Sequence, residues 1–280
     1  MDKHTQKRRI WAEAKKRPLV FAVYCIVRLI VIVSLAAALL RRDFESAFTC
    51  VLVLVLFMIP LFLERSLAIK LPTTLEIIIL LFIFAAEILG ELQCYFIQYP
   101  NWDTMLHTTS GFLCAAVGFS LIDILNRDSK IKFSLSPVYV AIVAFCFSMT
   151  IGVLWEFFEF GADRVLGLDM QKDTVVHTIT SVSLDETMQN KPVTISDIHC
   201  VQVDGQDLGF DGYLDIGLYD TMEDLFVNFI GAVTFSIIGF FYLKQRGKGR
   251  FARQFIPVIK EEVDTAYVSE KTEPPEDRNG

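Results

Sequence analysis

Long apolar stretches alternate with shorter polar ones along most of the chain, and this pattern predicts membrane-spanning helices. A helix needs about 20 apolar residues to cross a bilayer. Six stretches are long enough, with boundaries near Leu19–Leu40, Ala47–Leu63, Leu75–Phe96, Thr104–Leu125, Val138–Phe160 and Met222–Leu243. The second stretch is short and contains Pro60, which can bend the end of a helix. We therefore expect an all-α polytopic membrane protein, built as a bundle of six transmembrane helices.

A segment with a different pattern separates the fifth apolar stretch from the sixth. This segment comprises residues 164–220. Two stretches within it alternate apolar and polar residues in places, which predicts β-strands at Thr174–Leu184 and Val193–Val203. Residues Glu186–Pro192 lie between them and have the composition of a turn. We therefore expect a small extracytoplasmic β-hairpin inserted between helices five and six.

The two ends of the chain differ from its apolar middle. The N-terminal tail is basic, whereas the last residues are polar and rich in proline and acids, a composition typical of disorder. The sequence therefore predicts a cytoplasmic basic tail (1–18), a membrane domain (19–243) that includes the polar loop, and a cytoplasmic C-terminal tail (244–280) that is partly disordered.

The composition agrees with a membrane protein and excludes some other classes. Apolar residues make up 53% of the 280 residues, and 24 residues are phenylalanine. The mean hydropathy of +0.45 is too high for an ordinary soluble domain. The net charge is −7, and no basic face indicates nucleic-acid binding. The six cysteines show no CxxC spacing, so we expect them to act as small apolar residues.

Lysine and arginine residues cluster at alternate ends of the apolar stretches, which orients the predicted helices because cytoplasmic loops are enriched in these residues. With six helices, one side of the membrane carries the basic clusters in residues 3–17, 65–70, 127–132 and 244–253. Arg41 and Arg42 are the exception and fall on the other side. We expect the basic side to be the cytoplasm and the membrane to be the plasma membrane, with both chain ends inside.

Acids, one amide and one histidine lie at the ends of four predicted helices, and the orientation places these four ends at the outer face. The set comprises Glu87, Glu91, Asp103, His107, Glu156, Glu159, Asp163, Asp220, Asp224 and Asn228. Ionisable groups are costly at membrane depth and usually line a site or a water-filled cavity. The alternative is that they are solvated ends of helices, since charges prefer the interface.

Asp103 and His107 are four residues apart, which puts both side chains on one face of a helix. Such a pair can bind a divalent metal, or the carboxylate can orient the imidazole as a proton carrier. The alternative is an aspartate near the helix N-terminus and a histidine that only packs against a neighbouring helix. The spacing favours neither the functional interpretation of this pair nor the structural one.

Glu156 and Glu159 are three residues apart on another helix, with Asp163 one turn further. Two neighbouring carboxylates in a low dielectric must share a proton, meet a cation or reach water. Together with an aspartate–histidine pair from a second helix they form a plausible set of ligands for a divalent metal. A di-iron centre is disfavoured, because bundles of that kind carry more than one histidine.

The third helix end repeats this spacing with Asp220, Asp224 and Asn228, whereas Glu223 points to another side. The candidate metal ligands are therefore Asp103, His107, Glu156, Glu159, Asp220 and Asp224. The residues expected to support them or to line the cavity are Glu87, Glu91, Asp163 and Asn228. His177 and His199 lie on the predicted hairpin, where we expect surface or packing roles.

The order of three motifs, DxxxH at Asp103, WExxE at Trp155 and YDTxxDxxxN at Tyr219, resembles the YjdF-type family of bacterial inner-membrane proteins. It is similar, more distantly, to VanZ-like proteins, which are associated with glycopeptide resistance. The resemblance covers residues 75–243 and implies a polytopic plasma-membrane protein of a bacterium. It departs at residues 169–215, where YjdF-type proteins have a short linker. The resemblance implies no reaction.

Three functions are compatible with these residues. The first is an outward-facing site that binds a divalent cation and acts on a lipid-linked or envelope substrate. The second is a proton- or ion-coupled transporter that uses the same carboxylates as a relay. The third is a non-enzymatic envelope stress or resistance protein, in which the polar cluster holds helices together. The lipid bilayer is the one partner common to all three, and the sequence leaves enzymatic activity and oligomeric state open.

Overall fold

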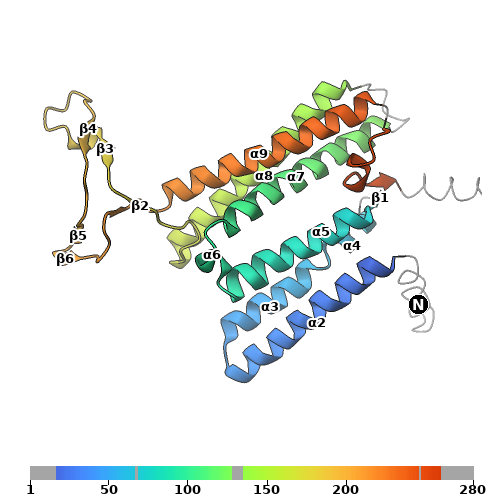
Figure 1. The fold of residues 1–280 in the computed structure, drawn as a ribbon, viewed down its shortest axis with the longest axis horizontal. Coiled ribbons are helices and arrows are strands. Elements are labelled where there is room, and N and C mark those ends of the chain that lie inside the picture. Colours follow the sequence, from blue (N-terminus) through green and yellow to red (C-terminus); the bar gives the residue numbers. More distant parts are fainter. Residues whose placement is uncertain (1–16, 67–68, 128–134, 246, 260–280) are drawn as a thin grey trace, which may run out of the picture. The chain divides into compact units, whose positions relative to one another are not determined.

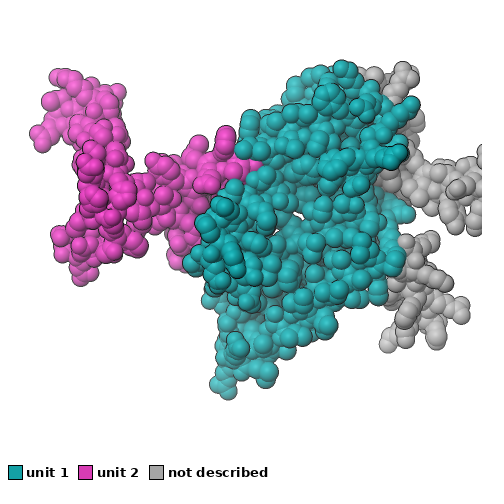
Figure 2. Space-filling view, viewed as in Figure 1, with its two compact units in different colours: residues 1–149, 228–280 teal, residues 150–227 magenta. Residues whose placement is uncertain are grey.

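The computed structural model describes residues 17–66, 69–127, 135–245 and 247–259. The chain divides into two compact units (Figure 2). Unit 1 comprises residues 1–149 and 228–280, and unit 2 comprises residues 150–227. Most of the predicted N-terminal tail and the end of the predicted C-terminal tail lie outside the described residues.

Unit 1 begins with two helices that lie side by side, α2 (Pro18–Arg41) and α3 (Phe44–Leu56) (Figure 1). Arg42 adopts the left-handed conformation that ends α2, and the Asp43 carboxylate accepts a hydrogen bond from the backbone N–H of Ser46 to cap α3. These two local signals explain why the connection between the helices is so short.

The second predicted span continues through α4 (Ile59–Ser66). Phe57 and Met58 interrupt the helix directly before Ile59, and the ring of Pro60 is tolerated in the first turn of the new helix. A short antiparallel pair of strands, β1 (Ile69–Lys70) with β8 (Val258–Ile259), then joins distant parts of the chain.

The third predicted span corresponds to an α-helix, a π-helix and the start of a short third helix. The α-helix α5 (Thr73–Ile83) passes directly into a π-helix, η1 (Phe84–Leu92), and the short helix α6 (Tyr95–Gln98) follows. Both glutamates predicted for this span, Glu87 and Glu91, lie in the π-helix. π-Helical turns are rare and often occur at functional sites.

Three long helices complete the helical part: α7 (Trp102–Arg127), α8 (Pro137–Leu166) and α9 (Leu218–Lys244). Helices α8 and α9 each belong partly to unit 1 and partly to unit 2. A 3-10 turn, η3 (Ala252–Gln254), follows α9.

Five helices among the described residues are long and apolar enough to cross a membrane. They are Pro18–Arg41, Phe44–Ser66, Trp102–Asn126, Pro137–Leu166 and Leu218–Lys244. The predicted third span is not one of the five, because α5 ends at Ile83 where the π-helix begins. The helical membrane architecture is therefore confirmed, and the count of six spans stays a prediction.

Unit 1 holds two apolar clusters. One is built from α2, α3, α5 and η1, with Val31, Val53 and Leu80 fully buried. The other surrounds the aromatic rings of Phe119 and Phe235, whose centroids are 5.9 Å apart. Close packing between α7 and α9 depends on Gly231, because a side chain there would collide with the backbone of Thr108.

Unit 2 contains small antiparallel strand pairs between the end of α8 and the start of α9. The pairs are β2 (Val175–Val176) with β7 (Tyr213–Leu214), β3 (Ile179–Ser181) with β4 (Val193–Ile195), and β5 (Gln202–Val203) with β6 (Gln206–Asp207). A 3-10 turn, η2 (Val182–Leu184), follows β3.

Strands β3 and β4 lie within the two predicted strand segments, but they are shorter than expected. The first part of the predicted first strand pairs instead with β7, nearly forty residues further along the chain. Alternation of apolar and polar residues marks extended segments, but it does not specify the partner of each segment. The side of the membrane on which this unit lies stays a prediction.

Candidate functional site

Three buried carboxylates converge in unit 2. Glu156 and Glu159 come from α8 and Asp224 from α9, and one carboxylate oxygen of each lies within 4.8 Å of the other two. Only 5% of Glu156, 7% of Glu159 and 3% of Asp224 is exposed. We call these three residues the carboxylate cluster.

Helix geometry explains how two of the three side chains meet. Glu156 and Glu159 are separated by three residues and therefore lie on the same face of α8. The indole N–H of Trp155 donates a hydrogen bond to Oε1 of Glu159 over 2.9 Å. Because Trp155 precedes Glu159 by one helical turn, this bond holds the carboxylate in place from within the same helix.

The loop after α8 adds a polar contact to the cluster. The side-chain amide of Gln171 donates to Oε2 of Glu156 over 3.5 Å and also to the hydroxyl of Thr221. Asp163 holds this loop, because its carboxylate accepts the backbone N–H groups of Met170 at 2.6 Å and Gln171 at 2.9 Å. Asp163 is thus linked to the cluster through this loop, and its predicted supporting role at a metal site stays a prediction.

Asp220 has a similar contact with the loop. Its Oδ2 accepts the backbone N–H of Lys172 over 2.8 Å, which joins the start of α9 to the segment after α8. Asp220 is not one of the three residues of the carboxylate cluster. Its predicted role as a metal ligand stays a prediction.

Asp103 and His107 lie in unit 1, near the start of α7. Nε2 of His107 is 3.5 Å from Oδ1 of Asp103, as expected for residues one helical turn apart. The side chain of His107 is 12% exposed, and that of Asp103 is 30% exposed. The pair can orient an imidazole for proton transfer or offer ligand atoms to a metal.

The remaining predicted residues also lie in unit 1. Asn228 is buried, and its side-chain amide lies 3.5 Å from the sulfur of Met149. A side chain at Gly111 would collide with the backbone oxygen of Asn228, so these two residues mark a close contact between α7 and α9. On η1, Glu87 is half-buried and Glu91 is exposed.

The carboxylate cluster is chemically suited to a cation. Carboxylates held this close in a dry environment repel one another unless they share protons or meet a positive charge. An all-oxygen set of ligands is preferred by hard divalent ions such as Mg²⁺, Ca²⁺ and Mn²⁺.

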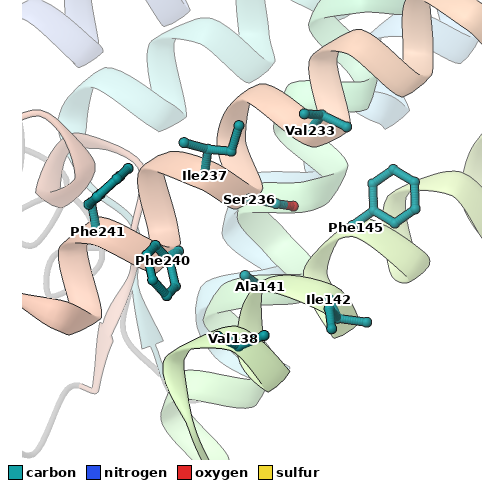
Figure 3. A pocket seen from close by; sticks show the side chains of 9 residues that line it. All are labelled: Val138, Ala141, Ile142, Phe145, Val233, Ser236, Ile237, Phe240 and Phe241. Atoms are coloured by element: carbon teal, nitrogen blue, oxygen red, sulfur yellow. The ribbon is translucent and has the colours of Figure 1, made fainter.

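A pocket in unit 1 lacks this chemistry (Figure 3). It has a volume of about 510 Å³ and lies between α8 and α9. The residues that line it are Val138, Ala141, Ile142, Phe145, Val233, Ser236, Ile237, Phe240 and Phe241. Ser236 supplies the one hydroxyl among apolar side chains, and no ionisable group lines the pocket. Apolar walls at this position suit contact with a lipid chain or a helix better than a polar reaction.

A family model described as a predicted membrane protein, DUF2238, matches residues 22–245. The chain belongs to the DUF2238 family. The match covers four of the five long apolar helices completely and most of the first, so family and structure agree on a membrane protein with several apolar helices. No curated protein and no solved structure matches the chain. The finer likeness to YjdF-type and VanZ-like proteins stays a prediction.

The sequence did not predict two polar contacts to the carboxylate cluster of this DUF2238 protein, those of Gln171 and Trp155. Gln171 lies in a loop whose path is set by Asp163, and nothing in its local sequence indicates contact with Glu156. Trp155 could have been found, because its four-residue spacing from Glu159 places both side chains on one helix face.

Proposed function

We propose that this membrane protein binds a divalent cation through Glu156, Glu159 and Asp224. The observation that supports the proposal is the convergence of three buried carboxylates from two helices. A divalent ion would neutralise most of their combined charge and offset the cost of burying them.

The hydrogen bonds around the cluster favour a fixed arrangement of ligands. Trp155 and Gln171 each donate to one oxygen of a cluster carboxylate. Such donors orient a ligating carboxylate and commonly raise metal affinity by 10–100-fold or so. The cluster therefore has both the ligands and the supporting contacts of a metal site.

We further propose that the site faces outward from a bacterial plasma membrane, with both chain ends in the cytoplasm. The distribution of lysine and arginine along the chain supports this orientation. A hard cation at that level could engage the phosphate groups of a lipid-linked or envelope substrate. The sequence-based prediction also assigns ligand roles to Asp103, His107 and Asp220, and single variants test each of them.

Binding of Mn²⁺ to the purified full-length protein in nanodiscs tests the proposal. Titration calorimetry should give one ion per chain, with affinity reduced at least tenfold in Glu159→Gln and in Asp224→Asn. Glu223→Gln is the matched control, because Glu223 is exposed and adjacent to Asp224, and it should bind as the wild type does.

Two results would overturn the metal site. One is the absence of Mn²⁺, Mg²⁺ and Ca²⁺ binding to a wild-type protein that elutes as a single folded species. The other is unchanged binding in both cluster variants. Proton uptake that depends on Glu159 in place of metal binding would instead support a proton-coupled carrier.

A further inference from the structure

Two histidines that are far apart in the sequence meet on the strand-containing part of unit 2. His177 directly follows β2, and His199 lies shortly before β5. Their imidazole centroids are 5.7 Å apart, with 44° between the ring planes. A lone histidine outside the core is usually a surface residue, but two imidazoles this close together are a candidate ligand set.

Backbone contacts fix the position of His177. Its carbonyl oxygen accepts the N–H of Ile198 over 3.0 Å, and its own Nδ1 lies 3.0 Å from the carbonyl oxygen of Ile198. The two residues are thus joined by a reciprocal pair of hydrogen bonds. The residue after Ile198 is His199, so these bonds bring the second imidazole next to the first.

A carboxylate fixes the position of His199. Nδ1 of His199 lies 2.7 Å from Oδ1 of Asp211, which precedes β7. Strand β7 pairs with β2, and the partner of Val176 is Tyr213. Between Asp211 and Tyr213 lies Gly212, with φ of +151°, where a Cβ atom would approach Val175 to 2.5 Å. The glycine therefore permits the close approach of the two strands next to Asp211, whose carboxylate contacts His199.

These contacts determine which ring nitrogen of each histidine is available. A carbonyl oxygen and a carboxylate oxygen can only accept hydrogen bonds, so Nδ1 must carry the proton in both rings. In the neutral imidazole Nε2 then bears the lone pair. Metal-binding histidines show this arrangement, with one ring N–H donated to a carbonyl or carboxylate and the other nitrogen on the metal.

We propose that His177 and His199 bind a divalent transition metal of the Zn²⁺ or Cu²⁺ class through their Nε2 atoms, with Asp211 orienting His199. With Zn–N bonds of about 2.0–2.1 Å, two imidazoles on a tetrahedral ion have ring centroids roughly 5 Å apart. The 5.7 Å separation is close to this value.

The site is open to solvent. The side chain of His199 is 67% exposed and that of Asp211 is 76% exposed. Among the described residues, these histidines belong to no group of three or more close protein ligands. The other coordination positions are therefore left for water or an external ligand, and we expect the ion to exchange readily.

This site is distinct from the carboxylate cluster in its chemistry. Imidazole nitrogens select Zn²⁺ and Cu²⁺, whereas an all-oxygen cluster suits Mg²⁺, Ca²⁺ and Mn²⁺. The two proposals can therefore fail separately. Variants of Glu159 or Asp224 should leave the imidazole site unchanged.

The test is Zn²⁺ calorimetry and Cu²⁺ electron paramagnetic resonance on the full-length protein in nanodiscs, with any polyhistidine tag removed. The informative variants are His177→Asn and His199→Asn. An asparagine side-chain amide can replace Nδ1–H as the donor to Ile198 or Asp211, but it supplies no nitrogen at the position of Nε2. Each variant should lower Zn²⁺ affinity at least tenfold and remove one nitrogen coupling from the Cu²⁺ spectrum.

Two further variants separate ligation from structure. Asp211→Asn should lower Zn²⁺ affinity by about 10–100-fold while both nitrogen couplings remain, because it acts through His199. His4→Ala removes a histidine near the N-terminus, outside the described residues, and should change nothing.

Wild-type affinity and spectra in both asparagine variants would overturn the proposal, as would a wild-type protein that binds neither ion. Loss of Zn²⁺ binding in Glu159→Gln with normal binding in both histidine variants would place the ion at the carboxylate cluster. That result would reject the imidazole site and leave the proposed function intact.

Discussion

Glu159 accepts a hydrogen bond from the indole N–H of Trp155, one turn earlier on α8, with 2.9 Å between Nε1 and Oε1. The bond ties a buried carboxylate to a half-exposed aromatic ring of the same helix. It also orients Glu159 toward Glu156 and Asp224, so it contributes both to stability and to the geometry of the cluster.

Removing this donor should destabilise the protein. Trp155→Phe keeps an aromatic ring and deletes the N–H, and hydrogen bonds to charged groups contribute roughly 1.5–3 kcal/mol. We expect the free energy of unfolding in detergent to fall by about 1–2 kcal/mol. In a double-mutant cycle with Glu159→Gln the two effects should not add. Strict additivity would show that the bond contributes nothing.

Gln171→Ala should weaken cation binding at the cluster without unfolding the protein. The variant removes the amide that donates to Glu156 and to Thr221. Loss of such a supporting donor typically lowers metal affinity by about 10–100-fold. The measurement is Mn²⁺ calorimetry, with Lys172→Ala as the neighbouring control, since the backbone N–H that Lys172 donates to Asp220 survives that change. Equal affinities in both variants would contradict the supporting role.

Gly231→Ala should be strongly destabilising, because the added Cβ would collide with the backbone of Thr108 across the contact between α7 and α9. Overpacking of this kind costs roughly 1–3 kcal/mol. Gly161→Ala is the matched control, since a Cβ at Gly161 meets nothing within 4 Å. Alanine favours a helix over glycine by up to about 1 kcal/mol, so this control should be neutral or stabilising. Thermal unfolding of both variants in one detergent measures this, and a midpoint for Gly231→Ala no lower than that for Gly161→Ala would contradict the collision.

The turn that follows η2 should open in acid. The hydroxyl of Thr187 and the backbone N–H groups of Thr187, Gln189 and Lys191 all donate to the Asp185 carboxylate. The Thr187 side chain, followed by the backbone donors, lowers the pKa of Asp185 from 3.8 to about 2.

Because the folded-state pKa is lowered, the stabilisation is complete above pH 4 or so and is lost as the pH falls through 2. Hydrogen exchange of the Gln189 and Lys191 amides, expressed as protection factors, should show this loss. In Asp185→Asn the protection should be weak at every pH. Protection that is flat with pH in the wild type would contradict the assignment.

Much of the membrane part could be predicted from the sequence, because length and hydropathy alone identify a long apolar helix. The predicted third span is the exception, because its change of helix type could not be predicted. Hydropathy does not distinguish an α-helix from a π-helix, so the change at Phe84 was not predictable. The pairing of β2 with β7 was equally hidden, since strand alternation carries no information about distant partners.

In the candidate site, contacts within a helix could be predicted from the sequence, whereas contacts made by loops could not. Helical spacing correctly placed Glu156 beside Glu159 and Asp103 beside His107. Contacts made by loops were not predictable, because a loop such as that of Gln171 has no periodicity from which to read a face. The meeting of His177 and His199 was missed for the same reason, because both residues lie just outside the strands, in segments without periodicity.

Cation binding by the carboxylate cluster is tested most directly by an anomalous difference map from crystals of the full-length protein grown with Mn²⁺. We expect a peak within bonding distance of carboxylate oxygens from Glu156, Glu159 and Asp224, and no such peak in the Glu159→Gln variant. A well-ordered cluster with no anomalous peak, or with an equal peak in the variant, would contradict it.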